Sequence, residues 1–397
     1  MPPYIPLHNL WWLAAGGASY GARYVKQRWG AARQAARVRP AHDPTGELLR
    51  WQAVYGYNPH SLVSIAPGAL LWSSPVTDGA VIYSKFGRVW LAAGDPLAPF
   101  DEIGELAHRF TLAAREKNRI AAFVPTTEHF ARDAVKHKMS AMKVGAAPYF
   151  DLQTWSPRGD RAKKMRAGVN QARRAGVAVE AIETVNESLQ RETALLCLRW
   201  LETRRAQTSF GWLLALDPFL HAERKRFFAA RDGGGQLVGF LAASPIPARD
   251  GWYLEDVLRL PSAPQGSADL LVVEALTKLS EAGAKLATLG TSPLATDGDD
   301  SISTGDHPLV ERALRVAASR LDAFYNFDGL RRFKAKFVPT WWESEYVLAP
   351  RGVMMPPHVT HAILRAIAPG GLTQLLTRKV WRMIHPKRPT RNLASRN

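Results

Sequence analysis

Short apolar runs separated by glycine and proline fill residues 51–150. Three segments are apolar and rich in strand-forming residues, and they predict strands: GALLWSSP, GAVIYSKFGRVWLAAGDP and RIAAFVPTT. Between the second and the third, FDEIGELAHRFTLAAREKN predicts a helix with Asp101 near its start. This part of the chain is therefore expected to form a mixed α/β unit.

A second series of elements begins near residue 187. ESLQRETALLCLRWLETR predicts a helix, RFFAARDGGGQLVGFLAASPI a β-hairpin, and DGWYLEDVLRL another strand. SADLLVVEALTKLSEAG has apolar residues three and four apart and predicts a helix, KLATLGTSPL predicts a strand, and a helix is expected at about 307–322 before the last strand. This order is that of a GNAT-type acyltransferase. We predict an α/β (α+β) fold of two GNAT-like units, the first with a looser order.

A strongly basic segment, SPRGDRAKKMRAGVNQARRAGVAVE, joins the two series. It predicts a helix capped by Ser156 or Asp160 and closed by Gly176. Such a helix is suited to the phosphates of a tRNA acceptor stem, to anionic lipid, or simply to solvent. Its cations are Arg158, Arg161, Lys163, Lys164, Arg166, Arg173 and Arg174.

The net charge of +17 is concentrated at the two ends of the chain. Residues 1–40 and 351–397 carry fifteen Lys and Arg and no acid, mixed with Trp, Tyr, Leu and Ile. Neither segment has the roughly 18 unbroken apolar residues that cross a bilayer. We expect amphipathic segments that lie on a membrane surface. The alternatives are helices packed on the body and, for the first segment, a signal peptide.

Length and composition complete the domain plan. A chain of 397 residues with 46% hydrophobic and 22% charged residues is globular and too long for one ordinary domain. We expect a basic N-terminal segment, a first unit, a basic linker helix, a second, catalytic unit and a basic C-terminal tail, at residues 1–40, 41–155, 156–177, 178–350 and 351–397.

Several chemistries find no support in the sequence. The single cysteine, Cys197, excludes a disulfide framework, and neither a phosphate-binding Gly-x-x-x-x-Gly-Lys-Ser/Thr loop nor a His-Glu-x-x-His pair occurs. We expect no metal and no cofactor. Acyl-CoA is also a poor donor, because the turn LPSAPQGSA has one glycine, Gly266, and two prolines that lack an N–H for a pyrophosphate.

Five segments, in order, resemble the catalytic region of lysyl- and alanyl-phosphatidylglycerol synthases, which are aminoacyl-tRNA-dependent lipid aminoacyltransferases. They cover roughly residues 50–350, and the first contains a Gly-Asp-Pro turn at Gly94. Glu345 replaces an arginine of the family's Trp-Glu-Pro-Arg-Tyr, and the family's transmembrane flippase region has no counterpart here. The segments are YGYNPHSLVSI with DGAVIYSKFGRVWLAAGDPLAP, RAKKMRAGVNQARRAGV, EDVLRLPSAPQGSADLLV, LGTSPLA and FYNFDGLRRFKAKFVPTWWESEYVLAP.

The resemblance implies transfer of an aminoacyl group from aminoacyl-tRNA to a hydroxyl of a membrane lipid, foremost phosphatidylglycerol, which alters membrane surface charge. It implies a cytoplasmic protein that is peripheral on the inner face of the cell membrane. Two alternatives remain open. One is a GNAT-like acyl- or peptidyltransferase whose acceptor is a peptide, a sterol or a diacylglycerol hydroxyl. The other is a non-catalytic membrane- or RNA-binding protein.

The family segments also nominate site residues. Asp256 is expected to hold the ammonium or accept a proton, and Arg259 to meet phosphate or the oxyanion, provided that the strand ends near Leu260 and lets both reach one site; a strand-end salt bridge is the alternative. Lys334 and Lys336 share a face in a strand and diverge in a helix, with at least one expected in the cleft. The predicted substrate-binding residues are Glu343, Glu345, Arg161, Lys163, Lys164, Arg166, Arg173 and Arg174.

Overall fold

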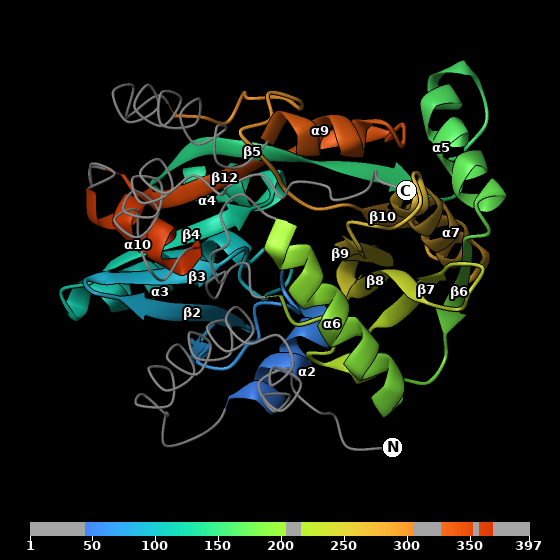
Figure 1. The fold of residues 1–397 in the computed structure, drawn as a ribbon. Coiled ribbons are helices and arrows are strands. Elements are labelled where there is room, and N and C mark those ends of the chain that lie inside the picture. The colour runs from blue at the N-terminus through green and yellow to red at the C-terminus, as the bar shows by residue number, and fades with distance from the viewer. Residues whose placement is uncertain (1–43, 204–215, 305–326, 352–356, 368–397) are drawn as a thin grey trace, which may run out of the picture.

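The computed structural model describes residues 44–203, 216–304, 327–351 and 357–367. The helix expected at 307–322, the segment 1–40 and most of the C-terminal tail lie outside the described residues. A single twisted sheet runs through the molecule, and helices pack against it (Figure 1).

The described strands follow in the order β1-β2-β3-β4-β12-β5-β10-β9-β8-β7-β6 across this sheet, with β11 paired to β5 at its side. Their bounds are β1 (Leu70–Ser73), β2 (Ala80–Phe86), β3 (Val89–Ala93), β4 (Ile120–Thr126), β5 (Met139–Asp151), β6 (Ala178–Ile182), β7 (Arg226–Arg231), β8 (Leu237–Ile246), β9 (Gly251–Arg259), β10 (Leu286–Thr288), β11 (Ser292–Pro293) and β12 (Trp341–Pro350).

The α-helices lie between single strands or groups of strands along the chain. The α-helices are α2 (Thr45–Tyr55), α3 (Ile103–Glu116), α4 (Glu128–Lys136), α5 (Lys163–Arg174), α6 (Glu187–Thr203), α7 (Ser267–Glu281), α9 (Phe327–Ala335) and α10 (Pro357–Ile367). Short 3-10 turns lie at η3 (Asp160–Ala162), η5 (Ala222–Arg224) and η6 (Pro247–Arg249).

The last strand of the chain joins the two units. β12 lies between β4 and β5 and is antiparallel to both, although β4 and β5 belong to the first half of the sequence. On its other edge β5 pairs with β10 of the second half, Ala287 lying opposite Phe150. The long strand β5 is therefore common to both halves, and the sheet has no break between them.

Alternating side chains of β3 face two separate apolar cores. Trp90 and Ala92 pack with α3 and α4 on one face, whereas Val89 and Leu91 pack with α10 on the other. A third and larger core lies around α5, α6, α7 and strands β7 to β9, and includes Cys197. Part of the predicted basic tail, α10, is thus packed on the body through one face.

The predicted fold class is confirmed: both series of strands and helices form a mixed α/β acyltransferase-like fold. The linker helix begins later than expected, at Lys163, and neither Ser156 nor Asp160 caps it. Gly176 does close it, with φ of +78°. The stretch before β12 forms helix α9 rather than strand or turn, so Gly329 lies within a helix. No described helix is long and apolar enough to cross a membrane.

Candidate functional site

Asp256 lies on β9 next to a β-bulge. The pairing of β9 with β8 shifts register between Ala242 and Ala243, so that Glu255 is the extra residue on β9. The buried Glu255 carboxylate accepts a hydrogen bond from the Ser244 hydroxyl at 2.5 Å and pairs with the buried Lys225 ammonium at 2.8 Å. Glu255 is therefore occupied by structural partners, and its neighbour Asp256 is not part of that pair.

Asp256 is half-buried, and its side chain forms no hydrogen bond or ion pair with any residue that the structure describes. Burial, followed by the charge of Glu255, raises the pKa of Asp256 to about 7. A carboxyl group that titrates near neutral pH can both accept and release a proton. Asp256 therefore has the properties of a general acid–base group.

Arg259 does not meet Asp256, because β9 continues through both residues. Asp256 lies opposite Ala242 and Arg259 opposite Gly239, with a regular ladder between. Residues three apart on a regular strand point to opposite faces. The strand does end where expected, with β9 finishing at Arg259 and the turn beginning at Leu260, but this end lies after both residues and does not bring their side chains together. Arg259 is exposed and forms no ion pair with Asp256, so the alternative salt bridge is not found.

Lys334 is buried at the C-terminal end of α9, with 6% of its surface exposed. Its ammonium donates to the carbonyl oxygens of Gly290 and Thr291, at 2.8 and 2.7 Å. Helix α9 is held in place by a two-pronged ion pair between Arg331 and Asp297, in the acidic loop that follows β11. The position of Lys334 thus depends on that loop.

Glu345 faces Lys334 from the middle of β12 and is 5% exposed. Its Oε1 accepts a hydrogen bond from the Thr291 hydroxyl at 3.1 Å and lies 3.9 Å from His60 Nε2. His60 is itself 2.9 Å from the Thr291 hydroxyl. The second carboxylate oxygen, Oε2, is buried and has no hydrogen-bond partner among the described residues. An unpartnered buried oxygen is costly, which marks this atom as a contact for a ligand.

Burial moves the pKa values of Lys334 and Glu345 toward neutrality. It lowers the pKa of Lys334 to about 7, an effect that the nearby Glu345 partly opposes, and raises the pKa of Glu345 to about 8. Burial likewise lowers the pKa of His60 to about 4, so His60 is a neutral imidazole at physiological pH. The site can therefore exchange protons with a substrate at little energetic cost.

Glu343, two residues before Glu345 on the same face of β12, already has a partner. Its carboxylate pairs with Arg249 at 3.0 Å, and both side chains are buried. The Arg249 guanidinium stacks over the rings of Tyr57 and Tyr149, at 4.7 and 4.3 Å from their centroids, and leaves one nitrogen, NH1, without a partner among the described residues. This pair adds a second unpartnered buried polar atom close to Glu345.

Tyr253 lies between the Asp256 side of the site and the Lys334 side. Its ring is 5.0 Å from that of His60, and a Cβ added to Gly290 would lie 2.4 Å from it. Burial, followed by the charges of Asp256 and Glu255, raises the pKa of Tyr253 well above its ordinary value. The two groups of titratable residues therefore form one contiguous site on β9, β12 and α9.

Lys336 points away from this site. It follows the end of α9 and forms an ion pair with Asp269 in the first turn of α7. Its ammonium also lies over the rings of Phe333 and Phe337, at 5.2 and 5.6 Å. The helical geometry makes the two lysines diverge, so the structure brings Lys334 to the site and leaves Lys336 at α7.

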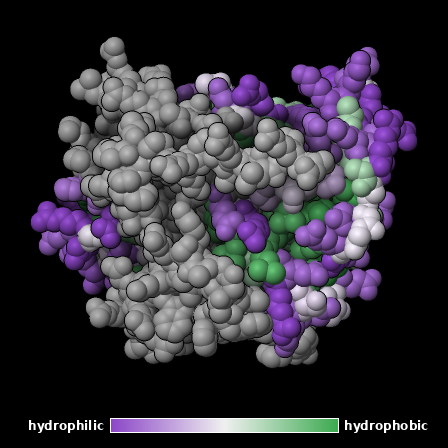
Figure 2. Space-filling view, viewed as in Figure 1, coloured by the Kyte–Doolittle hydropathy of each residue, from purple (hydrophilic) through white to green (hydrophobic). Residues whose placement is uncertain are grey.

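The basic residues of the linker form a separate, exposed surface on α5 and η3, the hydrophilic edge at the upper right of Figure 2. Two of them are held by partners: Arg173 pairs with Glu274 at 2.7 Å, and Arg166 donates to backbone carbonyls. The other five are exposed with no ion pair to a described residue, namely Arg158, which precedes η3, and Arg161, Lys163, Lys164 and Arg174.

Four polar residues of the site are not among the predicted ones. His60 and Thr291 lie within the segments YGYNPHSLVSI and LGTSPLA, so their signal was present but could not be separated from that of their neighbours. Tyr253 has the pattern of an ordinary strand residue. Arg249 lies in the turn η6, which no periodicity marks. No group of three or more His, Cys, Asp or Glu that could hold a metal ion occurs in the described part of the chain.

A bulged strand that presents an unpaired acid, beside a buried lysine and glutamate in a continuous two-unit sheet, defines an acyltransferase-type α/β protein. A solved structure of L-PGS from Bacillus licheniformis aligns with a TM-score of 0.67 at 19% identity, covering 81% of this chain and 96% of that one. The C-terminal domain of a protein from Agrobacterium fabrum assigned as a lysylphosphatidylglycerol synthetase aligns with a TM-score of 0.68 at 22% identity, covering 82% and 98%. Both share the fold.

The family model for the C-terminal region of phosphatidylglycerol lysyltransferase matches residues 58–349, and the chain belongs to this family. The phosphatidylglycerol lysyltransferase of Bacillus subtilis is 22% identical over 66% of this chain and 30% of its own length. The bifunctional lysylphosphatidylglycerol biosynthesis protein LysX of Nocardia farcinica is 24% identical over 85% of this chain and 30% of its own length. The chain thus spans about 30% of the length of these curated relatives.

Proposed function

We propose that this chain transfers an aminoacyl group from aminoacyl-tRNA to a hydroxyl of a membrane lipid, phosphatidylglycerol. Membership of the phosphatidylglycerol lysyltransferase family supports the lipid acceptor. The buried acid–base groups around Asp256, Lys334 and Glu345 support ester chemistry at this site. Because aminoacyl-tRNA is a cytoplasmic donor, the reaction belongs at the inner face of the cell membrane.

One observation supports the choice of donor: groups of the protein itself already occupy the N-terminus of α7, where a pyrophosphate would bind. In acyl-CoA enzymes this helix end binds the pyrophosphate through free N–H groups. Here Asp269 places a carboxylate in the first turn and pairs with Lys336. Helix α5 packs directly on the turn, since a Cβ on Gly266 would lie 1.9 Å from the carbonyl oxygen of Gly168. A pyrophosphate would meet a carboxylate and a helix backbone, so a different acyl carrier is favoured.

The chemistry assigned to the site is a balanced ester exchange. The lipid hydroxyl attacks the carbonyl carbon of the aminoacyl ester, and its proton passes to Asp256. The tetrahedral oxyanion is stabilised by an N–H of Lys334. When the intermediate collapses, the bond to the tRNA 3′ oxygen breaks and the proton moves from Asp256 to that oxygen. A carboxyl pKa of about 7 suits both the uptake and the release.

The remaining groups are assigned to binding. Glu345, with its unpartnered Oε2, receives the ammonium of the aminoacyl group, and the added positive charge favours its ionised form. Glu343 adds negative charge near this ammonium while it remains paired with Arg249. The exposed Arg259 binds a phosphate of the tRNA or of the lipid, outside the buried part of the site. The exposed cations of α5 bind the tRNA backbone without reading its sequence.

A transfer assay with the full chain tests the proposal. Purified protein, phosphatidylglycerol vesicles and a mixture of radiolabelled aminoacyl-tRNAs are expected to yield labelled lipid. Treatment of the tRNA with RNase removes the signal, and radiolabelled acetyl-CoA does not replace it. Labelling from acetyl-CoA to the same extent, with no tRNA present, refutes the assignment of the donor.

A further inference from the structure

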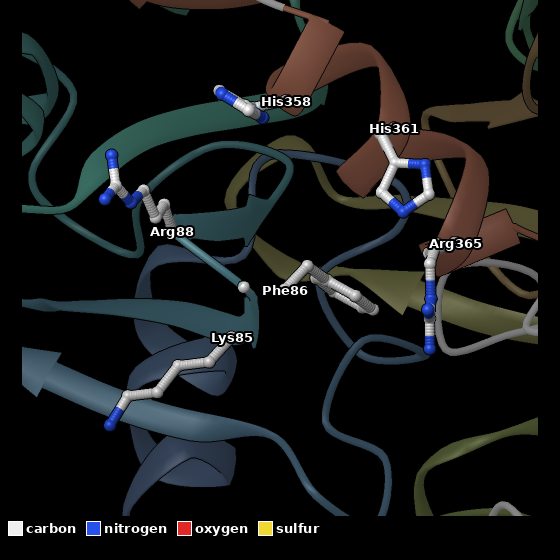
Figure 3. A pocket seen from close by; sticks show the side chains of 7 residues that line it. Lys85, Phe86, Arg88, His358, His361 and Arg365 are labelled. Atoms are coloured by element: carbon white, nitrogen blue, oxygen red, sulfur yellow. The ribbon is translucent and has the colours of Figure 1, made fainter.

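A basic pocket lies at the other end of the sheet from Asp256. Its volume is about 440 Å³, and Figure 3 shows basic side chains placed around Phe86. Strands β2 and β3 lie five positions or more from β9 in the sheet order, which corresponds to about 24 Å at the usual strand spacing of about 4.8 Å. The pocket is therefore separate from the site described above. Its lining is Lys85, Phe86, Gly87, Arg88, His358, His361 and Arg365.

Two rigid elements build the pocket. The β2–β3 hairpin turns at Gly87, whose φ is +60° and whose carbonyl oxygen is held by the guanidinium of Arg119 at 3.1 Å. Helix α10 buries Val359, Ala362 and Ala366 against β3 and β12. The adjacent flank of the helix, one residue or about 100° around, carries His358, His361 and Arg365, three and four residues apart, toward the hairpin.

The pocket has the charge of an anion site. Three permanent cations, Lys85, Arg88 and Arg365, and two histidines line it, and the lining contains no acid. All five are exposed, and none forms an ion pair with a residue that the structure describes. Like charges held this close repel one another, and a bound anion relieves that repulsion. The volume is within the range of small-ligand sites.

We propose that this pocket binds the phosphate of an anionic phospholipid and docks the chain on the membrane surface. A lipid is favoured over RNA by two observations. The half-buried Phe86 places an aromatic ring among the cations of the lining, a feature that binding of a phosphate backbone does not require. The sequence that continues from α10, residues 368–388, mixes Leu, Val, Trp and Ile with five cations and no acid, the composition of an interfacial segment.

This docking site deepens the proposed function, on which it rests only for the choice of phosphatidylglycerol as the probe. A lipid bound here lies far from Asp256, so the pocket positions the enzyme on the bilayer and does not hold the reacting headgroup. This arrangement also keeps the tRNA and the membrane, both negatively charged, apart. Helix α5 faces the tRNA at one end of the sheet, and α10 faces the membrane at the other (Figure 1).

Vesicle sedimentation with the full chain, without any aminoacyl donor, tests the inference. The vesicles contain phosphatidylcholine alone or equal parts of phosphatidylcholine and phosphatidylglycerol, at low salt. The triple variant Lys85→Gln, Arg88→Gln, Arg365→Gln is compared with a matched variant of α5, Lys163→Gln, Lys164→Gln, Arg174→Gln. Each cation near an anionic surface contributes about a fivefold factor, so the pocket variant should bind on the order of a hundredfold more weakly. The α5 variant should keep its vesicle binding.

Equal losses in both variants mean general charge attraction and overturn the inference, as does an unchanged pocket variant. Loss of tRNA binding by the pocket variant with vesicle binding intact identifies an RNA site instead. The two proposals fail separately. A wild type that binds vesicles through the pocket but transfers nothing refutes the reaction, whereas transfer with pocket-independent vesicle binding refutes the docking site.

Discussion

Two adjacent carboxylates, Glu255 and Asp256, should respond in opposite ways to loss of their charge. Glu255→Gln leaves Lys225 buried without a counter-charge, which costs about 3 kcal/mol or more. Asp256→Asn removes a group with a raised folded pKa and no partner, so stability at pH 8 should be unchanged or higher. Urea denaturation of both variants at pH 8 measures the difference. A similar loss in the two would mean that Asp256 is part of the structural ion pair.

The same Asp256→Asn variant should lose transfer activity. Removing one preorganised group at the reacting centre typically costs about a hundredfold or more in rate. Asp101→Asn, at an exposed carboxylate near the start of α3, is the matched control and should keep full activity. Initial rates with aminoacyl-tRNA, corrected for the folded fraction, provide the measurement. Residual activity that simply follows the folded fraction would assign Asp256 to the scaffold.

Glu345 makes stability depend on pH. Its pKa is raised from 4.5 to about 8, so between these values the native state holds a proton that the unfolded chain has released. The contribution of Glu345 to stability therefore falls as pH rises through this window, by at most about 1.4 kcal/mol per pH unit. Glu345→Gln cannot titrate, and its stability relative to wild type should increase from pH 5 to pH 8. Thermal melts of both proteins from pH 5 to pH 8 provide the measurement. A stability difference between variant and wild type that does not change with pH contradicts the raised pKa of Glu345.

Helix α5 can approach α7 only because position 168 has no side chain. A Cβ there would lie 2.0 Å from the Asp269 carboxylate, and Gly266, at the start of the same helix α7, also approaches the backbone of Gly168. Gly168→Ala should therefore cost about 1–3 kcal/mol by overpacking, despite the better helix propensity of alanine. Gly46→Ala in α2, where nothing lies within 4 Å, is the matched control and should be neutral or slightly stabilising. Equal melting temperatures for both would show that α5 is not tightly docked.

Elements with local signals could be predicted from the sequence, and those that depend on distant partners could not. The hairpin β7–β8 and helix α7 follow from a glycine turn and from apolar spacing. The sequence left strand and helix open for the stretch that forms α9, and its place is set by the ion pair of Arg331 with Asp297 and the burial of Lys334. Long β5, with its small alanines, has little local strand signal and is stabilised by β12 and β10.

The site shows the same division. Asp256, Lys334 and Glu345 could be nominated from family segments, but pairing of Glu343 with Arg249 and of Lys336 with Asp269 depends on contacts between residues about 70 to 90 positions apart. His60 and Tyr253 reach the site only because the first unit packs against β9. A sequence pattern of period two or 3.6 carries no information about such meetings.

At the scale of the whole molecule, the two units should fold as one. A fragment of residues 41–177 lacks β12 and leaves both β4 and β5 with an open edge, and a fragment of residues 178–397 lacks both partners of β12 and one of the two partners of β10. Each fragment alone should be unfolded or insoluble, and co-expressed fragments should purify together. The full chain should unfold in a single calorimetric transition. Two separated transitions, or a soluble folded fragment, would show independent domains.

The position of β12 also bears on how the chain is made. β12 begins about 190 residues after β5 ends, yet it fills the gap between β5 and β4. At a synthesis rate of about 5–20 residues per second, the ribosome delivers it roughly 10–40 s after its neighbours have emerged. During that interval two strands expose backbone groups that will pair with any extended segment nearby. The newly made chain is therefore expected to depend on chaperones until translation is nearly complete.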